Sequence, residues 1–258
     1  MVKLIYCLRR LPTLSLEEFQ HYWRTNHGPL VQSVAEVTKT RRYVQSHTIP
    51  DERMEAQRQA LGRPEPFDGV AMLWWDSVAD FAPPERTKER EKAGLLLHED
   101  EQRFIDLARS PLWLAEEIPV ITALRDEDTS ARPSSRVKIV YCGRRLPNLT
   151  RDEFQQYWRT DHGPLVKSHE DVLRIRRYVQ SHTAHDEVNE RMRTPLSRPL
   201  PYDGVAELWW ESMEDRQPSN PDPKRVQAAH QLFEDEKKFV DHGQSPVFLT
   251  KEYVFINR

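Results

Sequence analysis

The alternation of hydrophobic and polar positions predicts a series of short strands. Val2–Leu8 is rich in β-branched and aromatic residues, as a partly buried strand would be. The same pattern predicts strands at Arg41–Thr48, Gly69–Trp75 and Leu112–Ile121. Each of the four has an equivalent 135 residues later, the first of them at Val137–Cys142. The pattern therefore predicts two matching sets of strands.

Helices are predicted between these strands. Ser15-x-x-Glu18 and Thr150-x-x-Glu153 have the spacing of capping boxes, and each precedes apolar residues that share one helical face. The first helix should end at His27-Gly28-Pro29, where we expect a break and a sharp turn. Glu85–Ala108 and Lys224–His242 are charged segments with a thin apolar stripe, which is typical of a helix that lies against a sheet.

An offset of 135 residues superimposes the two halves of the sequence without a gap. Arg41–Thr48 matches Arg176–Thr183 at all eight positions, and Tyr22–Val31 matches Tyr157–Val166 except at Asn26/Asp161. This similarity predicts a duplicated unit. One repeat should span residues 1–123 and the other 137–258, with a polar linker at 124–136.

Each half has the order strand, helix, strand, strand, helix, strand, which is that of a ferredoxin-like unit. Such a unit carries its helices on one face of a four-stranded antiparallel sheet, so the other face needs a cover. The nearest cover is the second copy in the same chain. The sequence therefore predicts an α+β protein in which two ferredoxin-like repeats pair about a pseudo-twofold axis, as a monomeric pseudo-dimer or a weak homodimer.

Composition and charge narrow the range of partners. The 38 Lys and Arg against 41 Asp and Glu leave no excess of positive charge for nucleic acid or an anionic membrane. The longest apolar stretches, such as Val70–Trp75, are too short for a membrane span, and Met1-Val2-Lys3 leads into a strand without a signal-peptide pattern. Cys7 and Cys142 form neither a disulfide framework nor a zinc motif and suit buried strand positions. We expect a cytoplasmic protein whose partner is a small molecule.

Two motifs resemble a known family. They are Phe19-x-x-Tyr22-Trp23-x-x-x-His27-x-Pro29-Leu30-Val31 and Arg42-Tyr43-Val44-Gln45-x-His47, and both occur again in the second half. This pattern is similar to the EthD family of the dimeric α/β-barrel superfamily. The resemblance implies two sheets that face each other in a barrel with a central cavity in each half. It leaves the reaction open, because related barrels include dehydratases, isomerases, cofactor-free monooxygenases and haem enzymes.

Four of the ten histidines form pairs related by the repeat, and they are the candidate catalytic residues: His27/His162 and His47/His182. An imidazole is well suited to acid/base catalysis near neutral pH. The alternative for His27 and His162 is structural, since a side chain at a helix break can bond to unpaired backbone groups.

A second group of candidates lies on strands. Alternation places Tyr43, Gln45 and His47 on one face, and this polar set fits a cavity better than a helix-covered core. We expect it to line a substrate pocket with one tryptophan of each Trp-Trp pair, although core packing is the other interpretation of those tryptophans. The candidate substrate-binding residues are Tyr43, Tyr178, Gln45, Gln180, Trp74, Trp209 and Glu207.

One asymmetry between the repeats bears on which half is active. Met72 of the first half corresponds to Glu207 of the second, so a carboxylate near His182 could charge or orient that imidazole. This would make the second half the active one. The alternative is that Glu207 faces solvent or pairs with an arginine.

Other site types have weak support. His98 and His230 are not equivalent in the repeats, which argues against a duplicated haem site, and no residues have the spacing of metal ligands or of a phosphate-binding loop. Repeated Arg9-Arg10 and Arg41-Arg42 could bind an acidic substrate, but solvation or salt bridges at strand ends are the preferred interpretation.

The leading functional hypothesis is a cofactor-independent lyase or isomerase, dehydratase-like, that uses histidine acid/base catalysis. Its substrate would be a small hydrophobic, aromatic or polyketide-type carbonyl compound. The alternatives are a non-catalytic small-molecule-binding or pathway accessory protein, and a cofactor-free monooxygenase.

Overall fold

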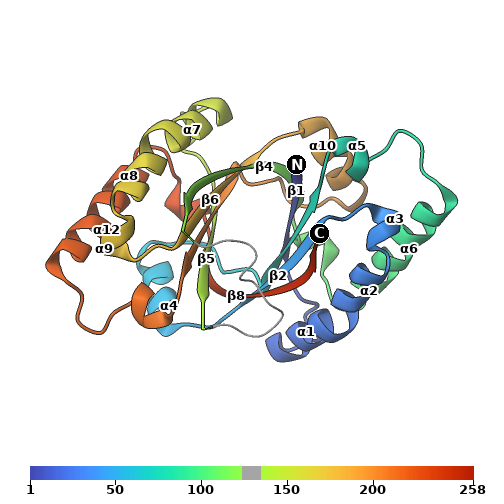
Figure 1. The fold of residues 1–258 in the computed structure, drawn as a ribbon, viewed down its shortest axis with the longest axis horizontal. Coiled ribbons are helices and arrows are strands. Elements are labelled where there is room, and N and C mark those ends of the chain that lie inside the picture. The colour runs from blue at the N-terminus through green and yellow to red at the C-terminus, as the bar shows by residue number, and fades with distance from the viewer. Residues whose placement is uncertain (124–134) are drawn as a thin grey trace.

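A closed barrel of eight antiparallel strands forms the centre of the computed structural model, which describes residues 1–123 and 135–258 (Figure 1). The order around the barrel is β1-β3-β2-β8-β5-β7-β6-β4. The strands are β1 (Val2–Leu8), β2 (Arg42–Thr48), β3 (Gly69–Trp75), β4 (Leu112–Thr122), β5 (Val137–Gly143), β6 (Arg177–Thr183), β7 (Gly204–Trp210) and β8 (Val247–Asn257).

The barrel closes where the two halves pair with each other. The last strand of each half lies along the second strand of the other, as β4 beside β6 and β8 beside β2. This arrangement confirms the predicted α+β fold of two ferredoxin-like repeats. The predicted linker, 124–136, falls outside the described residues except for its last two positions.

Helices cover the barrel in two groups on opposite sides (Figure 1). One group is α1 (Leu16–Tyr22), α2 (Gly28–Ser33), α3 (Ala35–Thr38), α5 (Val78–Phe81), α6 (Lys88–Glu101) and α10 (Asp186–Arg193). The other is α4 (Glu52–Ala60), α7 (Arg151–Tyr157), α8 (Gly163–Ser168), α9 (Glu170–Leu173) and α12 (Pro223–Glu236). The short helices α11 (Met213–Arg216), η2 (Leu107–Arg109), η5 (Thr194–Leu196) and η6 (His242–Gln244) complete the described elements. None of the described helices has the length and apolar character needed to cross a membrane.

Two helices cross from one repeat to the helices of the other. In Figure 1, α10 of the second half lies beside α5 of the first, and α4 lies on the side of the second half. Asn189 of α10 fixes this position, because its Oδ1 accepts the backbone N–H of Leu114 in β4 at 2.7 Å. The sequence predicted neither helix. Met54 in α4 and Asn189 in α10 are their only buried residues. The apolar face of α10 consists of only two partly buried side chains, Val188 and Met192, which is too little to identify a helix from the sequence.

The first helix of each repeat does not break at its histidine. A π-helical turn, η1 (Trp23–His27) or η4 (Trp158–His162), joins it to the next helix, and Gly28 keeps right-handed helical geometry. The predicted sharp turn is therefore wrong. The wider turn accommodates Pro29, which has no N–H to donate and sits in the first turn of α2. A side chain on Gly28 would overlap the Phe255 ring, with a 2.3 Å approach, so glycine is required by packing.

Charged side chains occupy the interior of the barrel. Glu207 bonds to Lys3 through Oε2 and lies 3.0 Å from Lys138 Nζ through Oε1. Each lysine has a second carboxylate, Glu117 for Lys3 at 2.8 Å and Glu252 for Lys138 at 2.7 Å. The arrangement is nearly symmetric, with Glu207 shared between the two lysines.

The tryptophans predicted to bind substrate belong to this interior network. Trp74 Nε1 donates to Glu117 at 2.8 Å, and Trp209 Nε1 donates to Glu252 at 2.7 Å. Apolar side chains and the facing sulfurs of Cys7 and Cys142, 3.7 Å apart, pack the rest of the interior. The expected central cavity lined by Trp74, Trp209 and Glu207 is thus occupied by these side chains.

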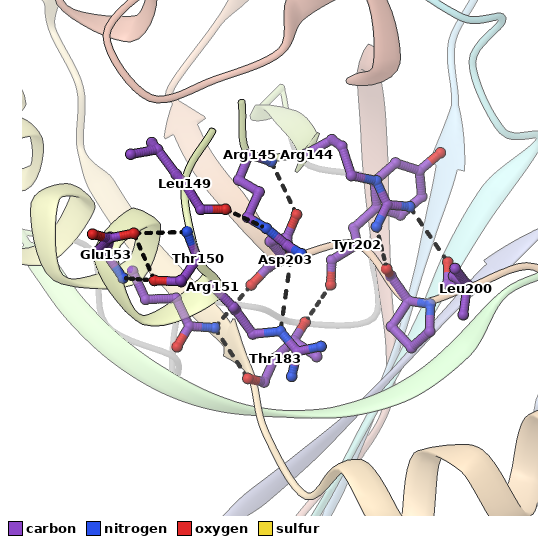
Figure 2. A network of polar contacts seen from close by, with 12 residues as sticks. Arg144, Arg145, Leu149, Thr150, Arg151, Glu153, Thr183, Leu200, Tyr202 and Asp203 are labelled. Carbon is purple, nitrogen blue, oxygen red and sulfur yellow. Dashed lines mark hydrogen bonds and ion pairs between the residues drawn. The ribbon is translucent and has the colours of Figure 1, made fainter. Parts of the chain in front are cut away.

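Arginines at the ends of the first strands hold loops in place (Figure 2). Arg145 pairs with the Asp203 carboxylate, and its Nε donates to the carbonyl of Leu149 at 2.9 Å. Arg144 donates to the carbonyl of Pro201 at 2.6 Å. Arg10 and Asp68 form the equivalent pair in the first half. Arg10 and Arg145 therefore form salt bridges at strand ends, as the preferred interpretation held, whereas Arg9 and Arg144 bond to backbone carbonyls.

Candidate functional site

A cavity of about 620 Å³ lies outside the barrel in the first half, between the sheet and the helices. This volume falls in the range of small-molecule sites. Outward-facing side chains of β1 and β3 form its floor, and Trp23, His27 and Leu97 contribute from the helices. Val188, Arg191 and Met192 of α10 also line it, so the cavity is built from both repeats. The floor residues are Leu4, Tyr6, Leu8, Ala71, Leu73 and Trp75.

His27 meets this cavity at the end of the π-turn. Its Nδ1 lies 2.8 Å from Oδ2 of Asp100 in α6, and Tyr22 donates to the other carboxylate oxygen at 2.7 Å. The hydrogen bond from His27 is the main cause of a lowered pKa of Asp100, so this carboxylate stays ionised. An ionised Asp100 holds the Nδ1–H tautomer of the imidazole and leaves Nε2 for a molecule in the cavity. Within the described residues Nε2 has no hydrogen-bond partner.

Glu101 follows Asp100 on α6 and also lines the cavity. Burial raises the pKa of its carboxyl, which favours the protonated form. In the parts of the chain that the structure describes, its carboxyl makes neither a hydrogen bond nor an ion pair. The cavity thus holds an imidazole and a carboxyl group that can donate a proton.

Tyr43 enters the cavity from β2 with its proton free to donate. Its hydroxyl oxygen accepts hydrogen bonds from Trp23 Nε1 at 3.0 Å and from Gln45 Nε2 at 2.9 Å. These two bonds occupy the oxygen's acceptor sites, so the O–H hydrogen is available to a ligand. Burial raises the pKa of Tyr43, and the phenol therefore remains a hydrogen-bond donor.

His47 lies behind Tyr43 rather than in the cavity. Its ring stacks on Trp23 with centroids 4.5 Å apart, and its Nε2 bonds to Gln45 Oε1 at 2.8 Å. Gln45 in turn donates to the backbone carbonyl of Trp23 at 2.9 Å. The polar side chains of β2 thus face the helices, because Gln45 and His47 contact Trp23 of the π-turn. Tyr43 lines this cavity, as expected, whereas Gln45 and His47 do not. His47 instead lines a separate hollow of about 520 Å³, together with Arg24 and Tyr253.

The second half contains the same residues around a much smaller space. His162 bonds to Asp235 at 2.8 Å, and Tyr178 accepts from Trp158 at 2.7 Å and from Gln180 at 3.1 Å. The cavity here measures only about 80 Å³. His182 stacks on Trp158 and bonds to Gln180, as His47 does in the first half.

Larger side chains close the cavity of the second half. Leu173 and Ile175, both buried, replace Thr38 and Thr40 of the first-half cavity. Arg216 replaces Phe81, and its guanidinium lies over the Trp210 ring, 5.9 Å from the centroid. Among the described residues, only those of the first half therefore leave room for a substrate at their histidine.

Glu207 does not reach His182. Glu207 is inside the barrel with the lysines, whereas His182 lies outside against Trp158. The register explains this separation, because Glu207 pairs with Val179 and His182 with Gly204, and the two side chains take opposite faces of the sheet. The suggestion that Glu207 makes the second half active is wrong.

The sequence reasoning missed Asp100 and Glu101. A signal was present, because the offset of 135 also preserves Glu99-Asp100-Glu101 as Glu234-Asp235-Glu236. These residues sit in a strongly charged helix, where acidic side chains usually face solvent. Their role depends on α6 packing over the π-turn, a contact that neither segment shows alone.

A second large groove in the described residues is less suited to chemistry. A groove of about 830 Å³ beside α4 contains charged residues that are already paired, such as Arg10 with Asp68 and Arg58 with Glu55. No three His, Cys, Asp or Glu side chains of the described ranges gather as metal ligands would.

The EthD domain matches the chain at residues 11–108 and again at 146–243. No curated protein matches it. Among solved structures, the chain is similar to a protein from Lactobacillus acidophilus provisionally named a monooxygenase, with 9% identity, 98% of this chain and 93% of the other covered, and a TM-score of 0.45. A similarly named protein from Fusobacterium nucleatum shows 4% identity, coverage of 98% and 92%, and a TM-score of 0.49.

A dye-decolorizing peroxidase from Bacteroides thetaiotaomicron shows 7% identity, coverage of 97% and 93%, and a TM-score of 0.47. We transfer no activity from these distant structures. The two domain matches cover most of the sequence and coincide with the two repeats. The chain therefore belongs to the EthD family and carries the EthD domain twice.

Proposed function

We propose that the first-half cavity is the active site of a cofactor-independent lyase or isomerase that moves a proton next to a carbonyl group. The substrate would be a small hydrophobic, aromatic or polyketide-type compound. The observation that carries this proposal is the meeting of His27, backed by Asp100, with Glu101 in one apolar cavity.

His27 is the proposed base. With Nδ1 held by Asp100, Nε2 removes a proton from the carbon beside the carbonyl. The C–H electron pair forms a C=C bond, and the carbonyl electrons move to oxygen. The Asp100 carboxylate then stabilises the imidazolium that results.

Tyr43 and Glu101 complete the proposed reaction. The free O–H of Tyr43 donates to the carbonyl oxygen, where negative charge develops. In a dehydration, protonated Glu101 gives its proton to a β-hydroxyl, which leaves as water while the carbonyl re-forms. In an isomerisation, that proton goes to a different carbon. Both outcomes balance without an external oxidant or reductant.

Deuterium exchange tests this chemistry before the substrate is known. A panel of aromatic ketones and β-hydroxy carbonyl compounds is incubated with the protein in D₂O, and exchange at the α-carbon is followed by NMR. We expect the wild-type protein to accelerate exchange of at least one compound. His27→Gln should lower that rate by about 10²-fold or more, and Asp100→Asn should lower it with the same binding affinity.

Two other results would each contradict the proposal. Binding without exchange, elimination or rearrangement would identify a non-catalytic binding protein. Oxygen consumption with an electron-rich phenol would identify a cofactor-free oxygenase.

A further inference from the structure

We infer that the first-half cavity takes an elongated aromatic carboxylate, whose anionic head is held by Arg86 and Arg191 at the entrance. This inference rests on the proposed function only in taking the cavity as the substrate site. It adds the charge and orientation of the substrate, which the groups around His27 leave open.

Two exposed arginines supply positive charge at the rim of the cavity. Arg86 precedes α6 and Arg191 lies on α10, and both line the cavity. Among the described residues, neither guanidinium makes a hydrogen bond or an ion pair. Glu101 is the only carboxylate among the described lining residues, and burial favours its neutral form. Two guanidinium groups beside an apolar cavity suit a planar carboxylate, which each can bind through paired hydrogen bonds.

A third arginine at the entrance has a structural task. Arg90 donates to the backbone carbonyl of Phe81 at 2.9 Å and also bonds to that of Asp80. Its counterpart Arg225 makes the same bonds in the second half. Arg86 lowers the pKa of Arg90 by repulsion, after burial as the main cause, so positive charge is concentrated here.

The two entrance arginines distinguish the open half from the closed one. Arg86 corresponds to Pro221, and Arg191 corresponds to Ala56. The half that lacks space for a ligand thus also lacks both cations. Duplicated packing residues such as Arg90 and Arg225 are instead kept in both halves.

Helix α6 sets the orientation of the substrate. Arg90 near the entrance and Glu101 are 11 positions apart on this helix, which corresponds to roughly 16 Å. A carboxylate at the entrance therefore leaves the reactive carbon several ångströms deeper, beside His27. A molecule of two or three fused rings has a suitable length.

A matched pair of probes tests the inference by fluorescence titration. Anthracene-2-carboxylate carries the anionic head, and anthracene-2-carboxamide has the same shape without charge. We expect the carboxylate to bind at least tenfold more tightly. Arg86→Gln and Arg191→Gln should each weaken carboxylate binding about tenfold and leave carboxamide binding within twofold. Lys92→Gln is the control, because it removes one charge from α6 at an exposed position outside the cavity lining.

Equal binding of the two probes would overturn the inference, as would failure of both to bind. An effect of Lys92→Gln as large as that of Arg86→Gln would also overturn it, since long-range charge would then suffice. Arginine-dependent binding without deuterium exchange would contradict the proposed reaction and support the carboxylate site. If neutral ketones exchange and neither arginine variant affects their exchange or the binding of the carboxylate, the proposed reaction is supported and the carboxylate site is overturned.

Discussion

At the scale of single residues, His47 and His182 are neutral because they are buried against tryptophan rings. Burial is the main cause that lowers the pKa of His47 to about 3 and that of His182 to about 4. In the unfolded chain each histidine binds a proton below about pH 6.5, whereas the folded protein does not. Their contribution to stability therefore falls as the pH decreases from about 6.5 towards 4.

Chemical denaturation at pH 7 and pH 5 checks this effect. Each histidine should lower the free energy of unfolding by about 2 kcal/mol between these values. In His47→Gln/His182→Gln the loss on acidification should be smaller by about 4 kcal/mol. The matched control is His230→Gln at an exposed position, which should keep the wild-type dependence. If the double variant lost as much free energy of unfolding between pH 7 and pH 5 as the wild type, these histidines would not be held neutral in the folded protein.

Glu207 offers a second residue-scale test, because one carboxylate serves two buried lysines. Attraction to Lys3 and Lys138 outweighs desolvation and lowers the pKa of Glu207. Glu207→Gln keeps the shape and removes the charge, and should lower the free energy of unfolding by about 3 kcal/mol. Met72→Leu at the equivalent position should cost below about 1.5 kcal/mol. If denaturant titrations gave equally small losses of unfolding free energy for Glu207→Gln and Met72→Leu, the role of Glu207 as a shared partner of both lysines would be contradicted.

At the scale of elements, the segment between α3 and β2 decides whether a cavity is open. Thr38 and Thr40 bond to each other at 2.8 Å, so replacing both leaves no unpaired hydroxyl. Thr38→Leu/Thr40→Ile transfers the residues of the closed half. We expect this variant to gain about 1 kcal/mol of stability and to lose binding of anthracene-2-carboxylate.

The reciprocal variant provides the control for this exchange. Leu173→Thr/Ile175→Thr should lower stability by about 2–4 kcal/mol, because both side chains are buried, and should leave binding at the first half unchanged. Retained binding in Thr38→Leu/Thr40→Ile would place the ligand elsewhere.

Elements were predictable where a local pattern determines them. Alternation located the strands, and the capping boxes at Ser15 and Thr150 located the helix starts, both of which are present. Helix α10 was missed because Asn189 is its only buried residue. The site was predictable only in part for a similar reason. His27 stands out as a repeated histidine, but its dependence on Asp100 arises when α6 packs over the π-turn.

At the scale of the whole molecule, duplication gives the two halves different tasks. Each half supplies a strand that closes the other's sheet, and α10 completes the cavity of the first half. The second half therefore supports the barrel and the site even though its own cavity is closed. The histidine–aspartate pair in the second half is kept without room for a substrate.

The most direct test of this account compares two equivalent variants, His27→Gln and His162→Gln, in the deuterium-exchange assay. Both remove an imidazole that bonds to an aspartate of the neighbouring helix at 2.8 Å, so their effects on folding should be alike, as circular dichroism would show. We expect His27→Gln to reduce exchange by about 10²-fold and His162→Gln to retain at least half of the wild-type rate. Equal losses in both variants, or a loss only in His162→Gln, would contradict the assignment of the active site to the first half.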